Sequence, residues 1–330
     1  MVVTFIGPTL LSGIGQMLHK HLELFPGSVY HELKDLTKLP MGDVAVAFAL
    51  PIPMWIDALR ALKNRFGRLH CMTICETETV HEAYGDLFAV CPDIIVASEF
   101  CKRVFEAQFP GRVRCTVVAA FVPPVPQGLL TGPPGQNDPG PAAPTGRYVF
   151  YHIGNIIDQR KNIKAILEAF MRLNKPGETE LVLKATCLQA VEIRLPGVRV
   201  INGLVSDEEI RKLHRECHCY VSFSSSEGIG MGAVEAALHS RPVIITDYGG
   251  APEYIKTPYL IPCGRQEIPR DDFLFKKGML WGKPDPDKLL EYMTHAFENR
   301  VETCEHPWTR TMVSRDAVLA ALESTFEGTA

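Results

Sequence analysis

Two glutamates flank a glycine-rich turn in the second half of the chain. Residues 224–235 read SSSEGIGMGAVE, which places Glu227 before the turn and Glu235 after it, with seven residues between them. The apolar run at 220–223 predicts a buried strand entering this turn, and a helix is expected to begin near Met231. Glycine lets the backbone approach a ligand, and free amides at a helix start attract oxygen-rich or anionic groups. The segment therefore predicts a binding site.

Each glutamate taken alone also has a purely structural explanation. Glu227 fits a solvated loop residue, and Glu235 would complement the dipole of the predicted helix. A glycine-rich turn is common in α/β proteins and is weak evidence by itself. Two carboxylates at this spacing across one such turn are more specific, and the prediction of a site depends on the pair.

Two adjacent cations form a second candidate site upstream. Residues 154–162 read GNIIDQRKN, and Arg160 and Lys161 precede a predicted helix. Cations are disfavoured at the positive end of a helix unless an anion lies between them and the amides, so the pattern predicts an anion site. Two exposed surface cations are the alternative, because surface charges cost little.

The first half of the chain contributes a shorter glycine pattern. Residues 7–15 read GPTLLSGIG between a predicted strand and a predicted helix, where Gly13 and Gly15 would permit close approach of a ligand. The third glycine of a dinucleotide-binding G-x-G-x-x-G pattern would fall at Leu18. This mismatch argues against a dehydrogenase.

Short apolar runs alternate with helical patterns in both halves of the chain. Alternation of this kind indicates α/β domains with parallel sheets covered by helices. Ser98 is expected to cap one helix, and Ser206 with Glu209 forms a capping box for another. The pattern after Asp285 is purely helical. Strands are expected at 2–6, 44–50, 69–75, 94–97, 115–119, 148–153, 180–184, 198–201, 220–223 and 243–246.

A composition break divides the chain into two halves. Residues 123–147 read PPVPQGLLTGPPGQNDPGPAAPTGR, and their proline and glycine content predicts an exposed linker. At 330 residues the chain exceeds what one core usually organises, so we expect two domains, at 1–122 and 148–307. A helix within 308–330 is a candidate for crossing back to the first domain. Two doubly wound domains place ligands in the cleft between them.

The bulk composition limits the classes of protein to consider. The formal net charge of −4 gives no electrostatic reason for a nucleic-acid partner. No run approaches the ~18 apolar residues of a membrane span, and glycines interrupt the N-terminal apolar run, unlike in a signal peptide. The ten cysteines are scattered through apolar segments, as expected in the reducing cytoplasm. Peripheral contact with a membrane stays open.

Metal and nucleophile chemistry find little support in the residue pattern. Residues 214–219 read HRECHC, but no second pair at zinc-site spacing accompanies them. A helix end leading into a buried strand is the preferred interpretation of this segment. Neither a Ser-His-Asp nor a Cys-His arrangement presents itself, and no DxD motif lies in a plausible loop. We therefore expect neither a metal ion nor another cofactor.

The glycine-rich turn resembles the E-x7-E motif of glycosyltransferase family 4, whose members often read EGFGLPxxE there. Ile229 stands in place of the aromatic residue and Gly232 in place of the proline. Residues 235–244, EAALHSRPVI, are similar to the family's EAxAxGxPVI run, and residues 246–253, TDYGGAPE, match its next loop. The resemblance covers most of the second half and the first half loosely. It implies a GT-B fold, with two Rossmann-like domains facing across a cleft.

The resemblance implies roles for the residues around the turn. Glu227 would contact hydroxyls of the donor sugar, and Glu235 would bind the nucleotide ribose. Backbone groups of the turn would hold sugar or phosphate oxygens. Together with Gly13, Gly15 and Asn155, the donor-binding set then comprises Gly228, Gly230, Met231, Gly232 and Glu235.

The cationic segment resembles the family's diphosphate-binding loop, which commonly reads G-R-x4-K-G or R-K-N. Arg160 and Lys161 would then clamp the diphosphate, and Asn155 stands where many relatives carry arginine. In the first half, ICETE at 74–78 precedes IVASEF at 95–100, and the pair resembles the F-E-T and S-E-F pattern of a subset of these transferases. Glu76 or Glu78 would orient the acceptor, with Glu76 the preferred residue, and a solvated loop end is the alternative explanation.

The implied activity is transfer of a hexose from a nucleoside-diphosphate sugar to a glycan, lipid or protein-linked sugar. Retention of anomeric configuration follows from the resemblance alone. A nucleoside diphosphate leaves readily once its charge is stabilised, so catalysis can rest on electrostatics and positioning. A nucleotide-sugar epimerase or hydrolase of the same fold is one alternative. A catalytically silent nucleotide-sugar-binding protein is the other.

Overall fold

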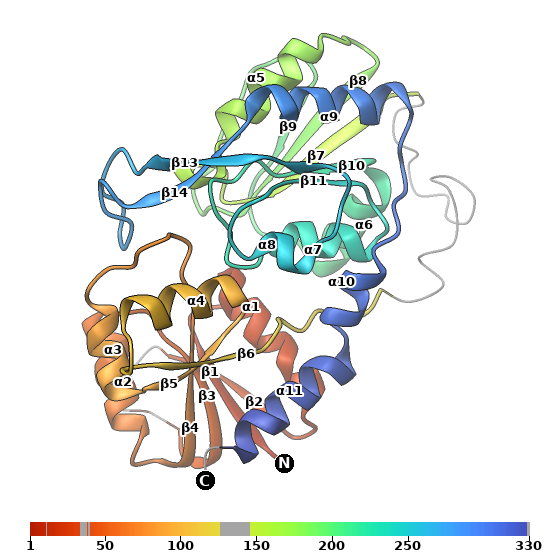
Figure 1. The fold of residues 1–330 in the computed structure, drawn as a ribbon. Coiled ribbons are helices and arrows are strands. Elements are labelled where there is room, and N and C mark those ends of the chain that lie inside the picture. The colour runs from red at the N-terminus through yellow and green to blue at the C-terminus, as the bar shows by residue number, and fades with distance from the viewer. Residues whose placement is uncertain (11, 34–37, 39, 126–145, 329–330) are drawn as a thin grey trace. The chain divides into compact units, whose positions relative to one another are not determined.

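The computed structural model describes residues 1–328, apart from residues 11, 34–37, 39 and 126–145 (Figure 1). The chain forms two compact units. Met1–Pro123, Glu267–Trp281 and Thr311–Ala330 make up the first unit, and Pro124–Gln266 and Gly282–Arg310 make up the second. Most of the linker expected at 123–147 lies outside the described residues.

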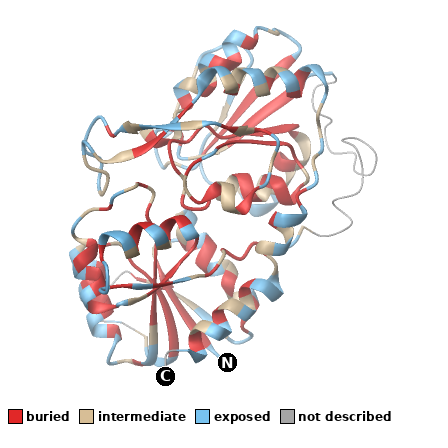
Figure 2. Ribbon diagram, viewed as in Figure 1, coloured by how far each residue is buried: buried red, intermediate tan, exposed pale blue. Residues whose placement is uncertain are grey.

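The first unit is built on a parallel sheet whose six described strands follow the order β2-β1-β3-β4-β5-β6. The strands are β1 (Val3–Gly7), β2 (Val29–Glu32), β3 (Gly42–Phe48), β4 (Phe66–Thr73), β5 (Asp93–Val96) and β6 (Arg114–Val117). The helices between them are α1 (Gly13–Lys20), the 3-10 turn η1 (His21–Leu24), α2 (Pro53–Leu62), α3 (Tyr84–Val90) and α4 (Glu99–Gln108). The central strands are buried, which explains their continuous apolar runs (Figure 2).

The last helix of the chain packs on this first sheet. In α11 (Arg315–Glu327), Phe326 is fully buried, and its ring centroid lies 5.9 Å from that of Phe25 and 4.8 Å from that of His70. Arg68 Nη1 donates to the carbonyl oxygen of Phe326 at 2.6 Å. The end of α11 thus contributes to the core of the first unit.

The second unit contains a parallel sheet whose described strands follow the order β12-β11-β10-β7-β8-β9. Its strands are β7 (Tyr148–Gly154), β8 (Thr179–Ala185), β9 (Val198–Ile201), β10 (Cys219–Val221), β11 (Val243–Thr246) and β12 (Leu260–Ile261). Its helices are the 3-10 turn η4 (Gln159–Lys161), α5 (Ile163–Leu173), α6 (Asp207–Glu216), α7 (Met231–Leu238), α8 (Ala251–Tyr254) and α9 (Pro286–Glu298). The helix α10 (Pro307–Met312) reaches the boundary with the first unit.

Helices cover both faces of the second sheet. In Figure 1, α5 and α9 lie on one face, and α6, α7 and α8 lie on the other. The core under α5 and α9 contains Tyr148 and Phe150 from β7, Ile166 from α5 and Met293 from α9. This arrangement confirms the α/β fold class that the alternating pattern predicts, including the Ser98 cap and the Ser206 capping box.

A two-stranded ribbon departs from the domain range expected at 148–307. The ribbon consists of β13 (Cys263–Glu267) and β14 (Leu280–Pro284), and Glu267–Trp281 groups with the first unit. Within that unit Ile268 is fully buried, and the amide of Glu78 donates to the carbonyl oxygen of Leu280 at 3.0 Å. These strands have few apolar residues, and pairing with a single partner leaves no periodic apolar pattern in the sequence.

The edge strand β2 was not expected either. Its four residues are exposed or half-buried, because the strand pairs with β1 alone. Half-exposed edge strands lack the apolar run that identifies buried strands. Among the described residues, no helix has the length and apolar character needed to cross a membrane.

Two glycines at the start of α1 offer a matched test of the packing there. A Cβ on Gly15 would lie 2.3 Å from the carbonyl oxygen of Thr9, whereas a Cβ on Gly13 would meet nothing within 4 Å. We expect Gly15→Ala to destabilise the first unit by about 1–3 kcal/mol through overpacking. Gly13→Ala should leave stability unchanged or raise it by about 0.5–1 kcal/mol, since alanine has less freedom to lose. Urea unfolding of both variants beside the wild type measures the difference, and equal effects would contradict the packing.

Candidate active site

Glu227 lies on the loop between β10 and α7, at the carboxyl end of the second sheet, and is surrounded by donors. Lys161 Nζ donates to Oε1 of Glu227 at 2.5 Å, and the hydroxyl of Ser224 donates to the same oxygen at 2.7 Å. Arg160 Nη1 donates to Oε2 at 3.3 Å. The side chain of Glu227 is only 13% exposed, so its charge is held by protein groups rather than by water.

The surroundings of Glu227 keep its carboxyl group ionised. Burial by itself would raise its pKa, but the positive charges of Lys161 and Arg160 outweigh burial. Hydrogen bonds from Lys161 and Ser224 act in the same direction, and the pKa falls from about 4.5 to about 2. The group is therefore a permanent hydrogen-bond acceptor near neutral pH.

Arg160 is the most enclosed of the cations in this cluster. Its guanidinium donates to Asp158 Oδ2 at 3.2 Å, to the carbonyl oxygen of Ser226 at 2.9 Å and to Glu227. Asp158 also caps η4 by accepting from the amide of Arg160 at 2.9 Å. Because its donors bind the β10–α7 loop, Arg160 fixes that loop in addition to contributing charge.

The cluster is electrically neutral as a whole. Arg160 and Lys161 supply two positive charges, and Asp158 and Glu227 supply two negative charges. Any phosphate that approaches must therefore share Lys161 with Glu227. The ammonium group of Lys161 has three protons, so it can donate to Glu227 and to a second acceptor together.

Side chains behind the loop hold its backbone. Asn162, in the left-handed conformation (φ 49°) between η4 and α5, donates from Nδ2 to the carbonyl oxygen of Phe223 at 3.1 Å and to Ser225 Oγ at 2.8 Å. The amide of Ser225 donates to the carbonyl oxygen of Arg160 at 2.8 Å. These bonds join the η4 and β10–α7 segments, which lie 60 residues apart in the sequence.

The start of α7 is built for close approach of the backbone. Gly230 caps the helix with φ 79°, a conformation that favours glycine. Gly232 is required by packing, because a Cβ there would lie 2.5 Å from the hydroxyl oxygen of Tyr220. The amides of Met231 and Gly232 precede the first intrahelical bond, in which Ala233 donates to the carbonyl oxygen of Gly230. The helix thus presents donors on the loop that also carries Glu227.

Three of the predicted site residues are in direct contact, and the others are placed as follows. Glu227, Arg160 and Lys161 are in direct contact. Glu235 is half-buried one turn into α7, Asn155 is exposed at the end of β7, and Gly228 is buried. Gly13, Gly15 and the half-buried Glu76 belong to the first unit. Packing against Thr9 is a sufficient structural reason for glycine at position 15.

His152 and Asp158 are members of the site that the sequence did not indicate. His152 on β7 is 1% exposed, and its Nδ1 bonds to the carbonyl oxygen of Val221 at 2.8 Å. Burial first, and then the charge of Lys161, lower its pKa to about 4 despite that bond and the charge of Glu227. A histidine inside an apolar strand gave no signal, and Asp158 was quoted only as part of the GNIIDQRKN loop.

The histidine- and cysteine-rich segment at 214–219 connects α6 to β10. His218 Nδ1 accepts from the amide of Val149 at 2.8 Å, and Cys217 and Cys219 are buried. No group of three or more metal-binding side chains occurs among the residues that the structure describes.

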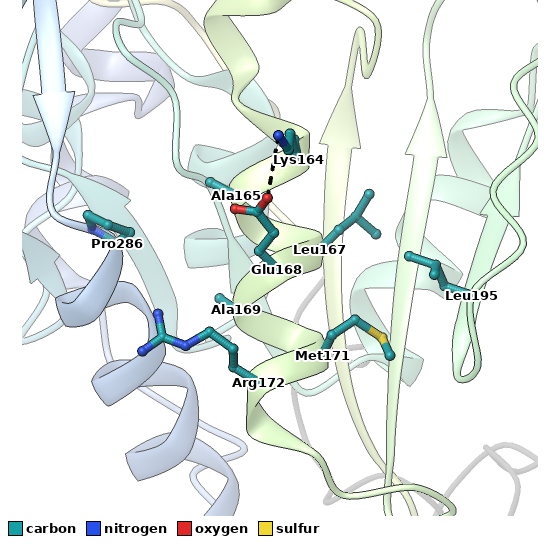
Figure 3. Close-up of a pocket in the computed structure, with 9 residues that line it drawn as sticks. All are labelled: Lys164, Ala165, Leu167, Glu168, Ala169, Met171, Arg172, Leu195 and Pro286. Atoms are coloured by element: carbon teal, nitrogen blue, oxygen red, sulfur yellow. Dashed lines mark ion pairs between the residues drawn. The ribbon is translucent and has the colours of Figure 1, made fainter.

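A separate hollow lies on the outer surface of the second unit (Figure 3). Its volume is ≈ 560 Å³, and it runs along α5, where Lys164 and Glu168 form an ion pair at 3.6 Å. None of the residues that contact Glu227 lines it. The lining residues are Lys164, Ala165, Leu167, Glu168, Ala169, Met171, Arg172, Leu195 and Pro286.

Comparison with known proteins finds one family model that matches part of the chain. Residues 147–299 match the family Glycosyl transferases group 1. The matched range contains the whole Glu227 cluster. No curated protein sequence matches the chain significantly.

Solved structures resemble the whole chain. Anabaena Alr3699/HepE in complex with UDP and glucose aligns with a TM-score of 0.62 at 12% identity, covering 99% of both chains. An α,α-trehalose-phosphate synthase (UDP-forming) from Burkholderia vietnamiensis aligns with a TM-score of 0.63 at 9% identity, again over 99% of both. The pneumococcal O-GlcNAc transferase GtfA, in complex with UDP and GlcNAc, aligns with a TM-score of 0.55 at 12% identity. That match covers 87% of this chain and 57% of GtfA.

These likenesses establish the fold. Two units with parallel six-stranded sheets, aligned over the full length of such relatives, define the GT-B fold of glycosyltransferases. The match of residues 147–299 to Glycosyl transferases group 1 agrees with this fold. The GT-B fold class is thus confirmed, and the second half of the chain resembles glycosyl transferases group 1 as its motifs indicate.

The charge of Glu227 predicts how the stability of the fold changes with pH. Because its folded pKa of about 2 lies below the ordinary 4.5, Glu227 stabilises the fold above about pH 4.5. That contribution is lost as the pH falls toward 2. Glu227→Gln strands two buried cations and should cost about 3–5 kcal/mol at pH 7. The gap to wild type should close on acidification.

Urea unfolding at a series of pH values from 7 to 3 measures this gap. Glu208→Gln is the control, because Glu208 pairs with Arg211 and Arg215 at an exposed position where ion pairs contribute little. A gap for Glu227→Gln that stays constant with pH would show that the carboxylate charge does not stabilise the loop.

Proposed function

We propose that this protein is a glycosyltransferase that moves a hexose from a nucleoside-diphosphate sugar to an acceptor, with retention of anomeric configuration. The observation that carries the proposal is the contact of Glu227 with Lys161 and Arg160, beside the start of α7, within a Glycosyl transferases group 1 domain. UDP is the first donor nucleotide to test, because several structural neighbours were solved with UDP. Retention rests on the E-x7-E resemblance.

The roles of the residues follow from their chemistry. The ionised Glu227 accepts hydrogen bonds from hydroxyls of the donor sugar, which orients the sugar without a proton transfer. Lys161 and the amides of Met231 and Gly232 donate to the departing diphosphate as its charge develops. Glu235 binds the nucleotide ribose, and Arg160 supports both the charge balance and the loop.

The remaining parts of the proposal concern the acceptor and the setting. Glu76 orients an acceptor of glycan, lipid or protein-linked sugar type. Since Lys161 and the helix amides supply positive charge, the reaction proceeds without a resident metal ion. The ten cysteines form no disulfide, and seven are buried, which fits a protein of the reducing cytoplasm.

Ligand-induced stabilisation tests the donor site first. Thermal unfolding with UDP, GDP, ADP, CDP or dTDP, and with NAD as control, should show an upward shift for one nucleoside diphosphate. A ligand at 100 times its Kd adds about 2.7 kcal/mol to the folded state. A shift with NAD alone would contradict the proposal and favour a dehydrogenase.

Substitution of Lys161 tests its part in turnover. Lys161→Ala should lower the rate of transfer at least tenfold, because the leaving diphosphate loses its side-chain cation. Lys164→Ala, three residues further at an 89% exposed position, is the matched control and should leave the rate unchanged. Melting curves confirm folding, and the assay is repeated with EDTA. Equal rates in both variants would exclude Lys161 from the reaction, and loss of activity with EDTA would exclude the metal-free mechanism.

Product analysis with and without acceptor separates transfer from related chemistry. A transferase releases nucleoside diphosphate in step with the glycosylated acceptor. Release at the same rate without acceptor would identify a hydrolase, and an epimerised sugar would identify an epimerase. Binding of a nucleoside diphosphate with no turnover for any sugar would identify a silent binding protein.

A further inference from the structure

A chain of buried polar groups lies behind Glu235 on the α6–α7 face of the second sheet. His214 on α6 is 1% exposed, and its Nδ1 lies 2.8 Å from the hydroxyl oxygen of Tyr151 on β7. Its other nitrogen, Nε2, lies 3.8 Å from Oε2 of Glu235 on α7. Three separate elements thus converge on one imidazole.

The hydrogen-bond partners of His214 favour one tautomer of its ring. Burial raises the pKa of the Tyr151 hydroxyl well above its ordinary value, so the hydroxyl keeps its proton. His214 Nδ1 is the partner within reach of that proton, so Tyr151 donates and Nδ1 accepts. A neutral imidazole that accepts at Nδ1 carries its proton on Nε2, which faces Glu235. The opposite tautomer would leave the Tyr151 proton without this acceptor and turn a lone pair toward a carboxylate.

Nε2 of His214 is buried without a hydrogen-bond partner in the described part of the chain. A distance of 3.8 Å is too long for a hydrogen bond, and a small movement of Glu235 would close it. Hydrogen bonds of functional groups are often long in a free enzyme and tighten in its complex.

The other groups around His214 leave this geometry intact. The ring of His239, at the end of α7, stacks on that of His214 with centroids 5.0 Å apart and planes 14° apart. Burial first, and then the neighbouring His214 and Arg241, lower the pKa of His239 to about 3, so His239 is neutral. Arg241 Nε donates to the backbone carbonyl oxygen of His214 at 2.8 Å, which anchors the end of α6.

We propose that His214 is a positioning residue for Glu235: Tyr151 fixes its tautomer, and its Nε2–H orients the Glu235 carboxylate toward a ribose hydroxyl. The proposal rests on the proposed function, because Glu235 binds ribose only if the chain binds a nucleotide. Tyr151 and His214 would then belong to the site without touching the ligand. This role also explains why His214 is buried beside Glu235 with Nε2 unpaired.

The tautomer is tested without any ligand. Long-range 1H–15N correlation spectra of protein labelled at histidine nitrogen should show His214 with Nε2 protonated and Nδ1 bare. The signal is assigned by its absence in His214→Gln. Tyr151→Phe removes the donor to Nδ1, and the spectrum should then show both tautomers. A wild-type spectrum with Nδ1 protonated, or one that Tyr151→Phe leaves unchanged, would overturn the proposal.

Two substitutions of His214 separate positioning from packing. Asparagine places an acceptor near Nδ1, so it keeps the bond from Tyr151 and loses the donor to Glu235. Glutamine extends its amide nitrogen about as far as Nε2, so it restores that donor and loses the bond from Tyr151. Positioning predicts weaker nucleotide binding in His214→Asn than in His214→Gln. A role through the Tyr151 bond alone predicts better stability and binding in His214→Asn. A packing role alone predicts that any difference in Kd follows the difference in unfolding free energy, because asparagine leaves the larger cavity, so urea unfolding of both variants accompanies the binding measurement.

Titration calorimetry with the nucleoside diphosphate that shifts the wild-type melting point measures the effect. The Kd of His214→Asn should exceed that of wild type by about two- to tenfold, the range of one hydrogen bond. The Kd of His214→Gln should return toward the wild-type value, with kcat little changed in both variants. The reverse order would overturn the proposal. If wild type binds no nucleotide, the proposed function fails, and the tautomer spectra still decide the Tyr151–His214 arrangement.

Discussion

The charge of Glu227 is the constraint on which the rest of the site depends. A carboxylate that is 13% exposed is costly unless cations and hydrogen-bond donors surround it. Lys161, Arg160 and Ser224 meet that requirement, and the carboxyl group remains ionised with a pKa of about 2. The cluster depends on its charged members, because removal of one of them leaves a buried charge less compensated.

This constraint couples two loops that are distant in the sequence. The η4 turn supplies Arg160 and Lys161, and the β10–α7 loop supplies Glu227, because β7 and β10 are parallel neighbours whose carboxyl ends share one edge of the sheet. Asn162 reinforces the connection through Phe223 and Ser225. A ligand that draws on Lys161 therefore acts on the loop that holds Glu227. Binding and loop geometry are linked through one ion pair.

The two glutamates of the motif are treated differently by the fold. Glu227 pairs with Lys161 and Arg160, whereas Oε2 of Glu235 lies 3.8 Å from Nε2 of the buried His214. One carboxylate is thus held by two cations, and the other lies beside a buried histidine. In the proposed function both carboxylates serve the binding of a sugar nucleotide.

The sequence alone determined the α/β fold class and most of the buried strands, and it indicated the residues proposed for the site. Buried parallel strands require continuous apolar runs, and the two glutamates of the E-x7-E pattern lie close together in the sequence. Both features can therefore be recognised from the sequence alone. The tertiary structure decided which charges meet. The pairing of Lys161 with Glu227, the bond from Arg160 to the carbonyl oxygen of Ser226, and the approach of His214 to Glu235 depend on sheet order. The tertiary structure also placed the polar strands β2, β13 and β14, since edge pairing leaves no periodic signal. Contacts between residues on different elements are fixed by packing, which local patterns do not encode.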